Sequence, residues 1–120
     1  MNEDTQALIR AFVKERDWEQ FHTPRNLVLA LTGEVGELAE LMQWKSDSEF
    51  TALLETPQGR ALVEAELADI ATYILRLADV MNVDLNQAIQ SKLKLNEQRY
   101  PADQVRGKAV KYTELGNDSA

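Results

Sequence analysis

Residues 30–45 read Ala-Leu-Thr-Gly-Glu-Val-Gly-Glu-Leu-Ala-Glu-Leu-Met-Gln-Trp-Lys. Apolar residues recur here and just before at the spacing of an amphipathic helix: Leu27, Leu31, Val35, Leu38, Leu41 and Met42. Glu34 and Glu37 share one face of this helix, where their like charges repel. Gly33 and Gly36 beside them each cost a helix interior about 1 kcal/mol relative to Ala. Carboxylate repulsion and two glycines in one turn both destabilise the helix, which indicates that this helix face has a function.

The same carboxylate spacing returns at Glu66 and Asp69, again within a strongly apolar helix. Four carboxylates facing one another would be destabilising, or would hold protons at neutral pH, unless a cation lay between them. Hard oxygen ligands suit Mg²⁺, so the two pairs predict one shared Mg²⁺ site. The alternative is that all four are solvated charges on amphipathic helices. A di-iron site is disfavoured because it needs Glu-x-x-His pairs, and the one histidine, His22, lies outside the long helices.

Composition limits the classes of function. The chain has 120 residues, 44% hydrophobic, which predicts one domain over residues 1–120. Its net charge of −7 argues against nonspecific nucleic-acid binding, which needs a positive surface. Cysteine is absent, which excludes disulfides and thiol nucleophiles, and neither a signal peptide nor a membrane span is evident. We therefore expect a cytoplasmic protein without membrane or nucleic-acid polymer partners.

Capping signals and apolar periodicity predict an all-α fold, most simply a four-helix bundle. The main helices are expected at residues 4–16, 24–44, 60–81 and 84–98, with a short helical piece at 49–54. Thr23-Pro24 and Asp84 are start signals, whereas 46–48 and 56–59 are expected breaks. Pro101 ends the last helix, and the tail, about 101–120, is expected to be partly flexible. No glycine-rich phosphate loop is present, which excludes a P-loop mechanism.

The apolar stripes of three of these helices are expected to be buried. The first carries Leu8, Ile9, Phe12 and Val13; the third carries Leu62, Val63, Leu67, Ile70, Ile74, Leu77 and Ala78; the fourth carries Leu85, Ala88, Ile89, Leu93 and Leu95.

Several further residues are candidates for ligand contacts. Tyr73 lies two turns after Glu66, either lining a cavity beside the metal or packed in the core. The last long helix offers side chains that either bind phosphate oxygens or form a solvated face: Lys92, Asn96 and Arg99. Aromatic side chains could stack on a nucleobase or seal one end of the bundle: Trp18, Phe21, His22 and Trp44.

A resemblance to a known family covers residues 12–115 and is carried by the blocks at 15–22, 24–27, 33–41, 43–45, 66–69, 83–85, 91–92, 99–101 and 111–115. In these blocks the chain resembles the MazG-like all-α nucleoside triphosphate pyrophosphohydrolases, most closely their dCTP pyrophosphatase branch.

The resemblance implies Mg²⁺-dependent hydrolysis of a deoxynucleoside triphosphate to its monophosphate and pyrophosphate, with dCTP or a modified form such as 5-methyl-dCTP as substrate. It assigns the metal and catalytic role to Glu34, Glu37, Glu66 and Asp69. It assigns phosphate contacts to Lys92, Asn96 and Arg99, and base and sugar contacts to Trp18, His22, Trp44 and Tyr73. It also implies a homotetramer of paired helical dimers, in which a neighbouring chain contributes to the pocket.

Two positions depart from the family pattern. Ala65 stands where many members have a second acidic residue, which leaves the metal quartet intact. Ile9 stands where close relatives carry a histidine near the base pocket, which opens the question of base selectivity. The alternatives are the same fold acting on dUTP or another non-standard nucleotide, and a non-catalytic acidic helical interaction module.

Overall fold

The computed structural model describes residues 3–109 and 113. Within this part of the chain there are helices and no strand, which confirms the all-α class. The elements are α1 (Glu3–Glu15), the 3-10 helix η1 (Glu19–Phe21), α2 (Pro24–Met42), α3 (Asp47–Leu54), α4 (Pro57–Val80), α5 (Leu85–Arg99) and α6 (Ala102–Val105). None of the described helices is long and apolar enough to cross a membrane. The cytoplasmic location stays a prediction.

The fold divides into two compact units, the first ending at Val83 and the second beginning at Asp84. The first holds α1 to α4, and the second holds α5 and α6. A single domain over residues 1–120 stays a prediction.

Two Thr-Pro sequences start the two long helices. Thr23 accepts a hydrogen bond from the Asn26 backbone N–H at 3.2 Å, which confirms the predicted start of α2. Thr56 accepts one from the Gly59 N–H at 3.0 Å, so residues 56–59 begin α4 and are not a break. In both cases Pro at the first helical position costs no hydrogen bond, because that N–H has no partner in a helix.

The remaining helix boundaries follow from local caps. Ser46 and Glu49 form a reciprocal capping box, which starts α3 two residues earlier than expected. Asp84 accepts from the Gln87 N–H at 3.0 Å, as predicted for the start of α5. After Pro101 the chain forms α6, where the sequence predicted only tail. The 111–115 block lies outside the described residues except for Thr113.

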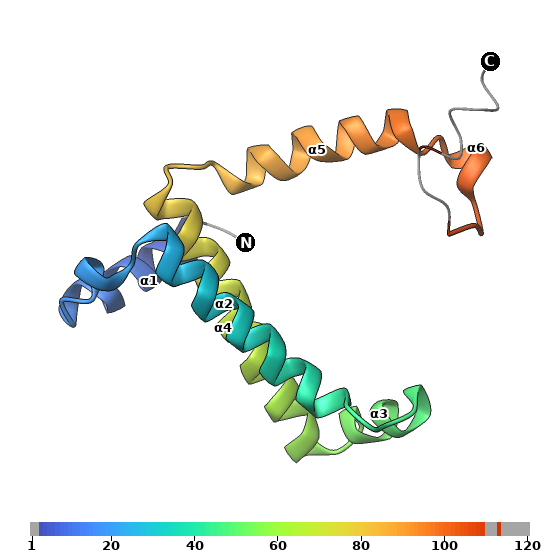
Figure 1. Ribbon diagram of the computed structural model, residues 1–120, viewed down its shortest axis with the longest axis horizontal. Helices are drawn as coiled ribbons and strands as arrows, with labels where there is room; N and C mark the ends of the chain where they lie inside the picture. Colours follow the sequence, from blue (N-terminus) through green and yellow to red (C-terminus); the bar gives the residue numbers. More distant parts are fainter. Residues whose placement is uncertain (1–2, 110–112, 114–120) are drawn as a thin grey trace. The chain divides into compact units, whose positions relative to one another are not determined.

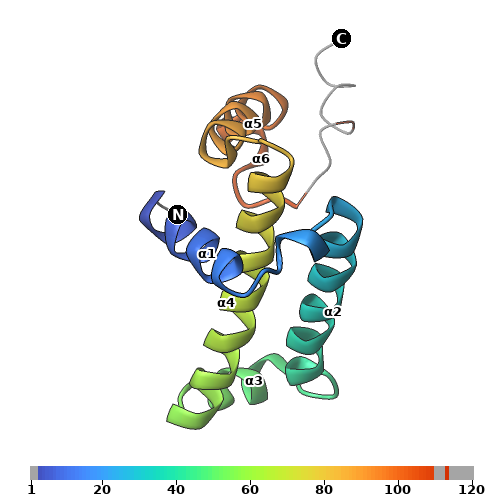
Figure 2. The same cartoon turned by 90° about the vertical axis from the view of Figure 1, so that its left-hand side faces the viewer.

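Helices α2 and α4 lie antiparallel and side by side, joined through α3, while α1 packs across α4 (Figures 1 and 2). Their buried apolar side chains form a small core: Val13, Leu27, Val63, Leu75 and Ala78. The predicted stripes are only partly buried. Leu8 is 73% exposed, while Phe12, Leu62, Leu67, Ile89, Leu93 and Leu95 are also exposed. Periodicity identifies an apolar face, but not what covers it.

Gly59 of α4 lies against Leu53 of α3. A Cβ atom at this position would overlap the Leu53 backbone carbonyl oxygen as well as the Leu53 side chain. At Gly36 in α2, a Cβ would meet no neighbouring atom within 4 Å in the part of the chain that the structure describes. The two glycines therefore form a matched pair, one sterically required and one not.

We predict that Gly59→Ala destabilises the fold by about 1–3 kcal/mol, because a backbone atom must move to admit the methyl group. Gly36→Ala is the control and should be neutral or stabilising by up to about 1 kcal/mol. Urea unfolding followed by circular dichroism measures both. Equal stability of Gly59→Ala and the wild type would contradict the packing described.

Candidate functional site

The two long helices bring carboxylates together as the spacing predicted. Glu34 and Glu37 project from α2 and Glu66 from α4. One oxygen atom of each lies within 4.8 Å of the others. The antiparallel pairing of α2 and α4 creates this cluster, because the residues are separated by about thirty positions in sequence.

The cluster holds oxygen atoms that need a partner. Oε2 of Glu34 and Oε2 of Glu66 are buried and accept no hydrogen bond within the described chain. Burial, followed by the nearby carboxyl groups of Glu66, Glu37 and Asp69, raises the pKa of Glu34 from 4.5 to about 7. The pKa of Glu66 is also raised, chiefly by burial. Buried polar groups are normally satisfied, so these two oxygens indicate that a proton or a cation belongs here.

Asp69 lies one turn after Glu66 on α4 and lines a cavity together with Glu34. It is not among the three residues with mutually close oxygens. Its negative charge nevertheless raises the pKa of both Glu34 and Glu66. The predicted quartet is therefore three close carboxylates with a fourth beside them.

The donor set fits a hard divalent cation. Among the described residues it contains only carboxylate groups, and those of Glu34 and Glu66 each have one oxygen without a hydrogen-bond partner. Mg²⁺ prefers such ligands and commonly completes its shell with water and substrate phosphates. The metal role of the four residues stays a prediction.

A cavity of about 530 Å³ adjoins the carboxylates. Glu34 and Asp69 form its acidic part, and an apolar wall comes from α1: Leu8, Ile9, Phe12 and Val13. The sequence predicted this stripe as buried core; in the structure only Val13 is buried, and the stripe lines the cavity. A site with an acidic end and an apolar wall suits a ligand that carries a metal-bound anion and a flat ring.

Trp18, His22 and Tyr73, which the sequence analysis named for base and sugar contacts, all line this cavity. The contacts themselves stay a prediction. The Trp18 ring packs edge-on against Phe12, with ring centroids 5.7 Å apart and an interplanar angle of 74°. Asp17, with φ of 54°, makes the turn that brings the chain from α1 to this position. The short connector between α1 and α2 therefore places Trp18 and His22, whereas Tyr73 comes from α4.

Other predicted contacts lie elsewhere. Trp44 follows α2 with φ of 67°, is 92% exposed and does not line the cavity. The three phosphate candidates belong to α5 in the second unit: Lys92, Asn96 and Arg99. The role of these four residues in ligand binding stays a prediction.

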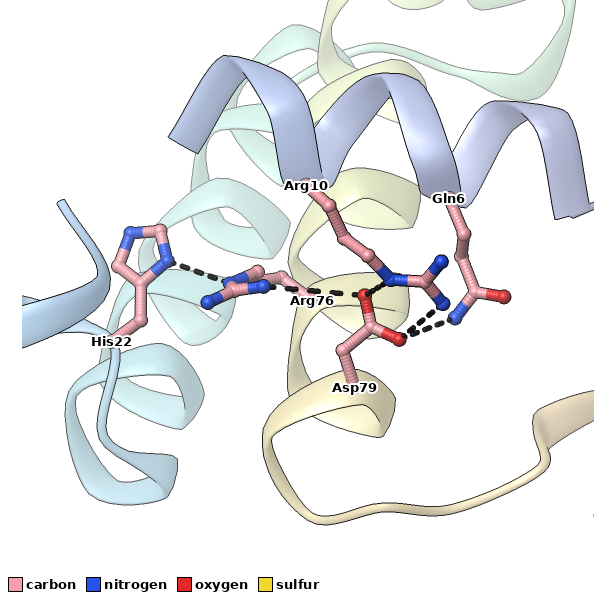
Figure 3. A network of polar contacts seen from close by, with 5 residues as sticks. All are labelled: Gln6, Arg10, His22, Arg76 and Asp79. Atoms are coloured by element: carbon pink, nitrogen blue, oxygen red, sulfur yellow. Dashed lines mark hydrogen bonds and ion pairs between the residues drawn. The ribbon is translucent and has the colours of Figure 1, made fainter. Parts of the chain in front are cut away.

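Sequence reasoning missed Arg76 and Thr72, which also line the cavity. Arg76 lies one turn after Tyr73 and two turns after Asp69, so its spacing places it on the same face of α4. Its side chain is 12% exposed and donates through Nε to Nδ1 of His22 at 3.0 Å (Figure 3). The helical spacing of Arg76 from Asp69 and Tyr73 could have identified it from the sequence.

Comparison with known proteins adds to this geometry. The model of the MazG-like family matches residues 30–115. The chain is 55% identical over 113 residues to dCTP pyrophosphatase 1 of Mus musculus, and 52% identical to that of Homo sapiens. In both cases the match covers 94% of this chain but 66% of the relative, so the chain spans just under two thirds of these proteins.

The crystal structure of a pyrophosphatase from Archaeoglobus fulgidus superposes on this fold with a TM-score of 0.77. The two chains are 37% identical in sequence, and the match covers 82% of this chain and 91% of the other.

The raised pKa of Glu34 predicts how metal-free stability depends on pH. Glu34 titrates near 7 when folded and near 4.5 when unfolded, so the folded protein binds more protons between these values. The contribution of Glu34 to stability is therefore lost as pH rises through about 7. In EDTA, the melting temperature of the wild type should fall relative to that of Glu34→Gln as pH rises from 5 to 8.

Glu40→Gln is the control, because Glu40 is an exposed carboxylate on the same helix. It should follow the wild type across the range. A melting temperature difference between wild type and Glu34→Gln that does not change with pH would contradict the shifted titration.

Proposed function

This chain belongs to the MazG-like family, and we propose that it is a Mg²⁺-dependent pyrophosphohydrolase that converts dCTP to dCMP and pyrophosphate. The observation that carries the proposal is the cluster of close carboxylates with unpartnered oxygens beside a cavity with an aromatic side. The names of the dCTP pyrophosphatase 1 relatives support dCTP as the substrate. We include modified forms of dCTP in the proposal.

The residues divide the work by chemistry. Glu34, Glu37, Glu66 and Asp69 would hold the metal, which when bound supplies charge neutralisation and an activated water. Reaction of one water with dCTP between the α and β phosphates gives dCMP and pyrophosphate. Trp18 and Tyr73 would pack against the base and sugar, while the α1 wall excludes water from them.

We propose that the phosphate oxygens are bound by Lys92, Asn96 and Arg99. Lysine and arginine would form charge-assisted hydrogen bonds to the phosphates, and the amide of Asn96 would add a neutral donor. These side chains lie on α5 at spacings of three and four residues, and thus on one side of that helix.

We also propose a homo-oligomer, a tetramer of paired dimers. The single chain buries few apolar side chains and leaves large ones exposed on both long helices: Leu29, Val35, Leu62 and Leu67. Faces of this kind are typical of permanent interfaces between subunits. Trp44, 92% exposed, would then reach the cavity of a neighbouring chain.

The activity is tested by pyrophosphate release from dCTP, dUTP, dATP, dGTP and TTP, each with Mg²⁺ and with EDTA. We expect metal-dependent release that is fastest with dCTP. Release fastest with dUTP would favour the alternative substrate. No release from any of the five would point first to a non-standard nucleotide and then to a non-catalytic interaction module.

Glu66→Gln tests the metal role. Loss of a direct ligand should lower kcat/KM for dCTP by about 100-fold or more, with helicity unchanged by circular dichroism. Glu64→Gln is the control, because Glu64 is exposed on α4 and pairs with Arg60. Undiminished activity of Glu66→Gln would contradict the assignment.

Light scattering tests the assembly. A tetramer has four times the chain mass of 13.6 kDa. Leu62→Lys should lower the mass, because a charge would be buried in the interface, whereas Glu64→Lys should not. A monomeric wild type would contradict the proposed oligomer.

A further inference from the structure

A polar network beside the cavity joins α1, α4 and the residue that follows η1 (Figure 3). Arg76 Nε donates to Nδ1 of His22 at 3.0 Å. Asp79, one turn later on α4, accepts from Arg10 through both oxygens, at 2.9 Å from Nε and 2.8 Å from Nη2. Gln6 Nε2 adds a third hydrogen bond at 3.2 Å. None of these groups belongs to the carboxylate cluster.

The contact between Arg76 and His22 fixes the proton of the imidazole. A guanidinium group has only donors and stays charged, so the Nδ1 atom that it contacts must accept. His22 is therefore neutral and carries its single proton on Nε2. Burial, followed by the charge of Arg76, lowers the pKa of His22, which agrees with the neutral form.

Asp79 holds Arg76 in this position. The side chains of Arg76 and Asp79 are 12% and 15% exposed, and Nη1 of Arg76 lies 4.0 Å from Oδ2 of Asp79. Arg10 also binds this carboxylate, so Asp79 lies against two guanidinium groups. A protonated His22 would add a third cation here, which electrostatic repulsion disfavours.

We propose that Arg76 and Asp79 are positioning residues for base selection, which hold His22 as a hydrogen-bond donor directed at N3 of a cytosine base in the cavity. This inference rests on the proposed function. Ile9 stands where close relatives carry a histidine, and the inference lets His22 supply the polar contact to the base in this chain.

The chemistry separates cytosine from uracil. N3 of cytosine is an acceptor, whereas N3 of uracil and thymine carries a hydrogen. A fixed Nε2–H donor pairs with the first and leaves the second without a partner. Sites that hydrogen-bond a ligand discriminate strongly, because a mismatched ligand leaves buried polar groups unpaired. Without Arg76, the imidazole could move its proton to Nδ1 and present Nε2 as an acceptor.

The first test reads the tautomer directly. His22 is the one histidine of the chain, so ¹⁵N-histidine labelling gives the signals of a single imidazole. Long-range ¹H–¹⁵N spectra of the full chain at pH 7.5, without nucleotide, should show Nε2–H. An Nδ1–H tautomer in the wild type would overturn the proposal, whatever the enzyme hydrolyses.

The second test measures binding of dCMP and dUMP by calorimetry, which requires no turnover. The wild type should bind dCMP more tightly, and Arg76→Met should reduce the ratio of the two affinities by about tenfold or more. Arg76→Lys keeps a charged donor and should retain more of that ratio. In the NMR spectra, Arg76→Met should also populate Nδ1–H.

The outcomes separate this inference from the proposed function. A wild type that binds dCMP selectively as Nε2–H supports the inference even if no triphosphate is hydrolysed. An unchanged affinity ratio in a folded Arg76→Met, or equal wild-type affinities for dCMP and dUMP, would overturn it while leaving the hydrolysis proposal intact. If Arg76→Met does not fold, the affinity ratio of Arg76→Lys against that of the wild type decides.

Discussion

Repulsion among carboxylates between α2 and α4 is the constraint on which the rest of the structure depends. The antiparallel pairing of these helices places Glu34, Glu37 and Glu66 within 4.8 Å, where burial and mutual repulsion raise the pKa of Glu34 to about 7. Packing has to hold the cluster together against this repulsion. The core that does so is small, and Leu27 is its most buried member. A bound cation would turn the same geometry from a cost into a stabilising contact.

The cavity joins the carboxylates to an apolar and aromatic surface. Glu34 and Asp69 belong to both the acidic cluster region and the cavity lining, so a ligand there meets the carboxylates at one end. The remaining lining comes largely from α1 and the adjoining connector, which are apolar and aromatic. In the proposed function, different elements would therefore bind the metal-bound anion and the base. Substitutions in α1 could then change the base preference without altering the carboxylates.

The sequence predicted what depends on local chemistry. Thr23 and Asp84 cap helices as expected, and the i,i+3 spacing placed the carboxylates on facing sides of α2 and α4. It did not predict contacts that depend on the path of the chain. The hydrogen bond between His22 and Arg76 joins residues 54 positions apart, and neither residue type specifies the other. Nor could periodicity show that Leu67 would be 52% exposed, because an apolar face looks the same whether its own chain or another covers it.

Asp79 links the position of α1 to the state of the imidazole. Gln6 and Arg10 attach α1 to this carboxylate, and Arg76 lies between it and His22. The helix that supplies the apolar wall and the residue that offers a hydrogen-bond donor therefore share one anchoring group. A shift of α1 that broke the Arg10 contact would also change the charge balance around Arg76. Asp79, which lies outside the carboxylate cluster, thus links the position of α1 to the hydrogen bonding of His22.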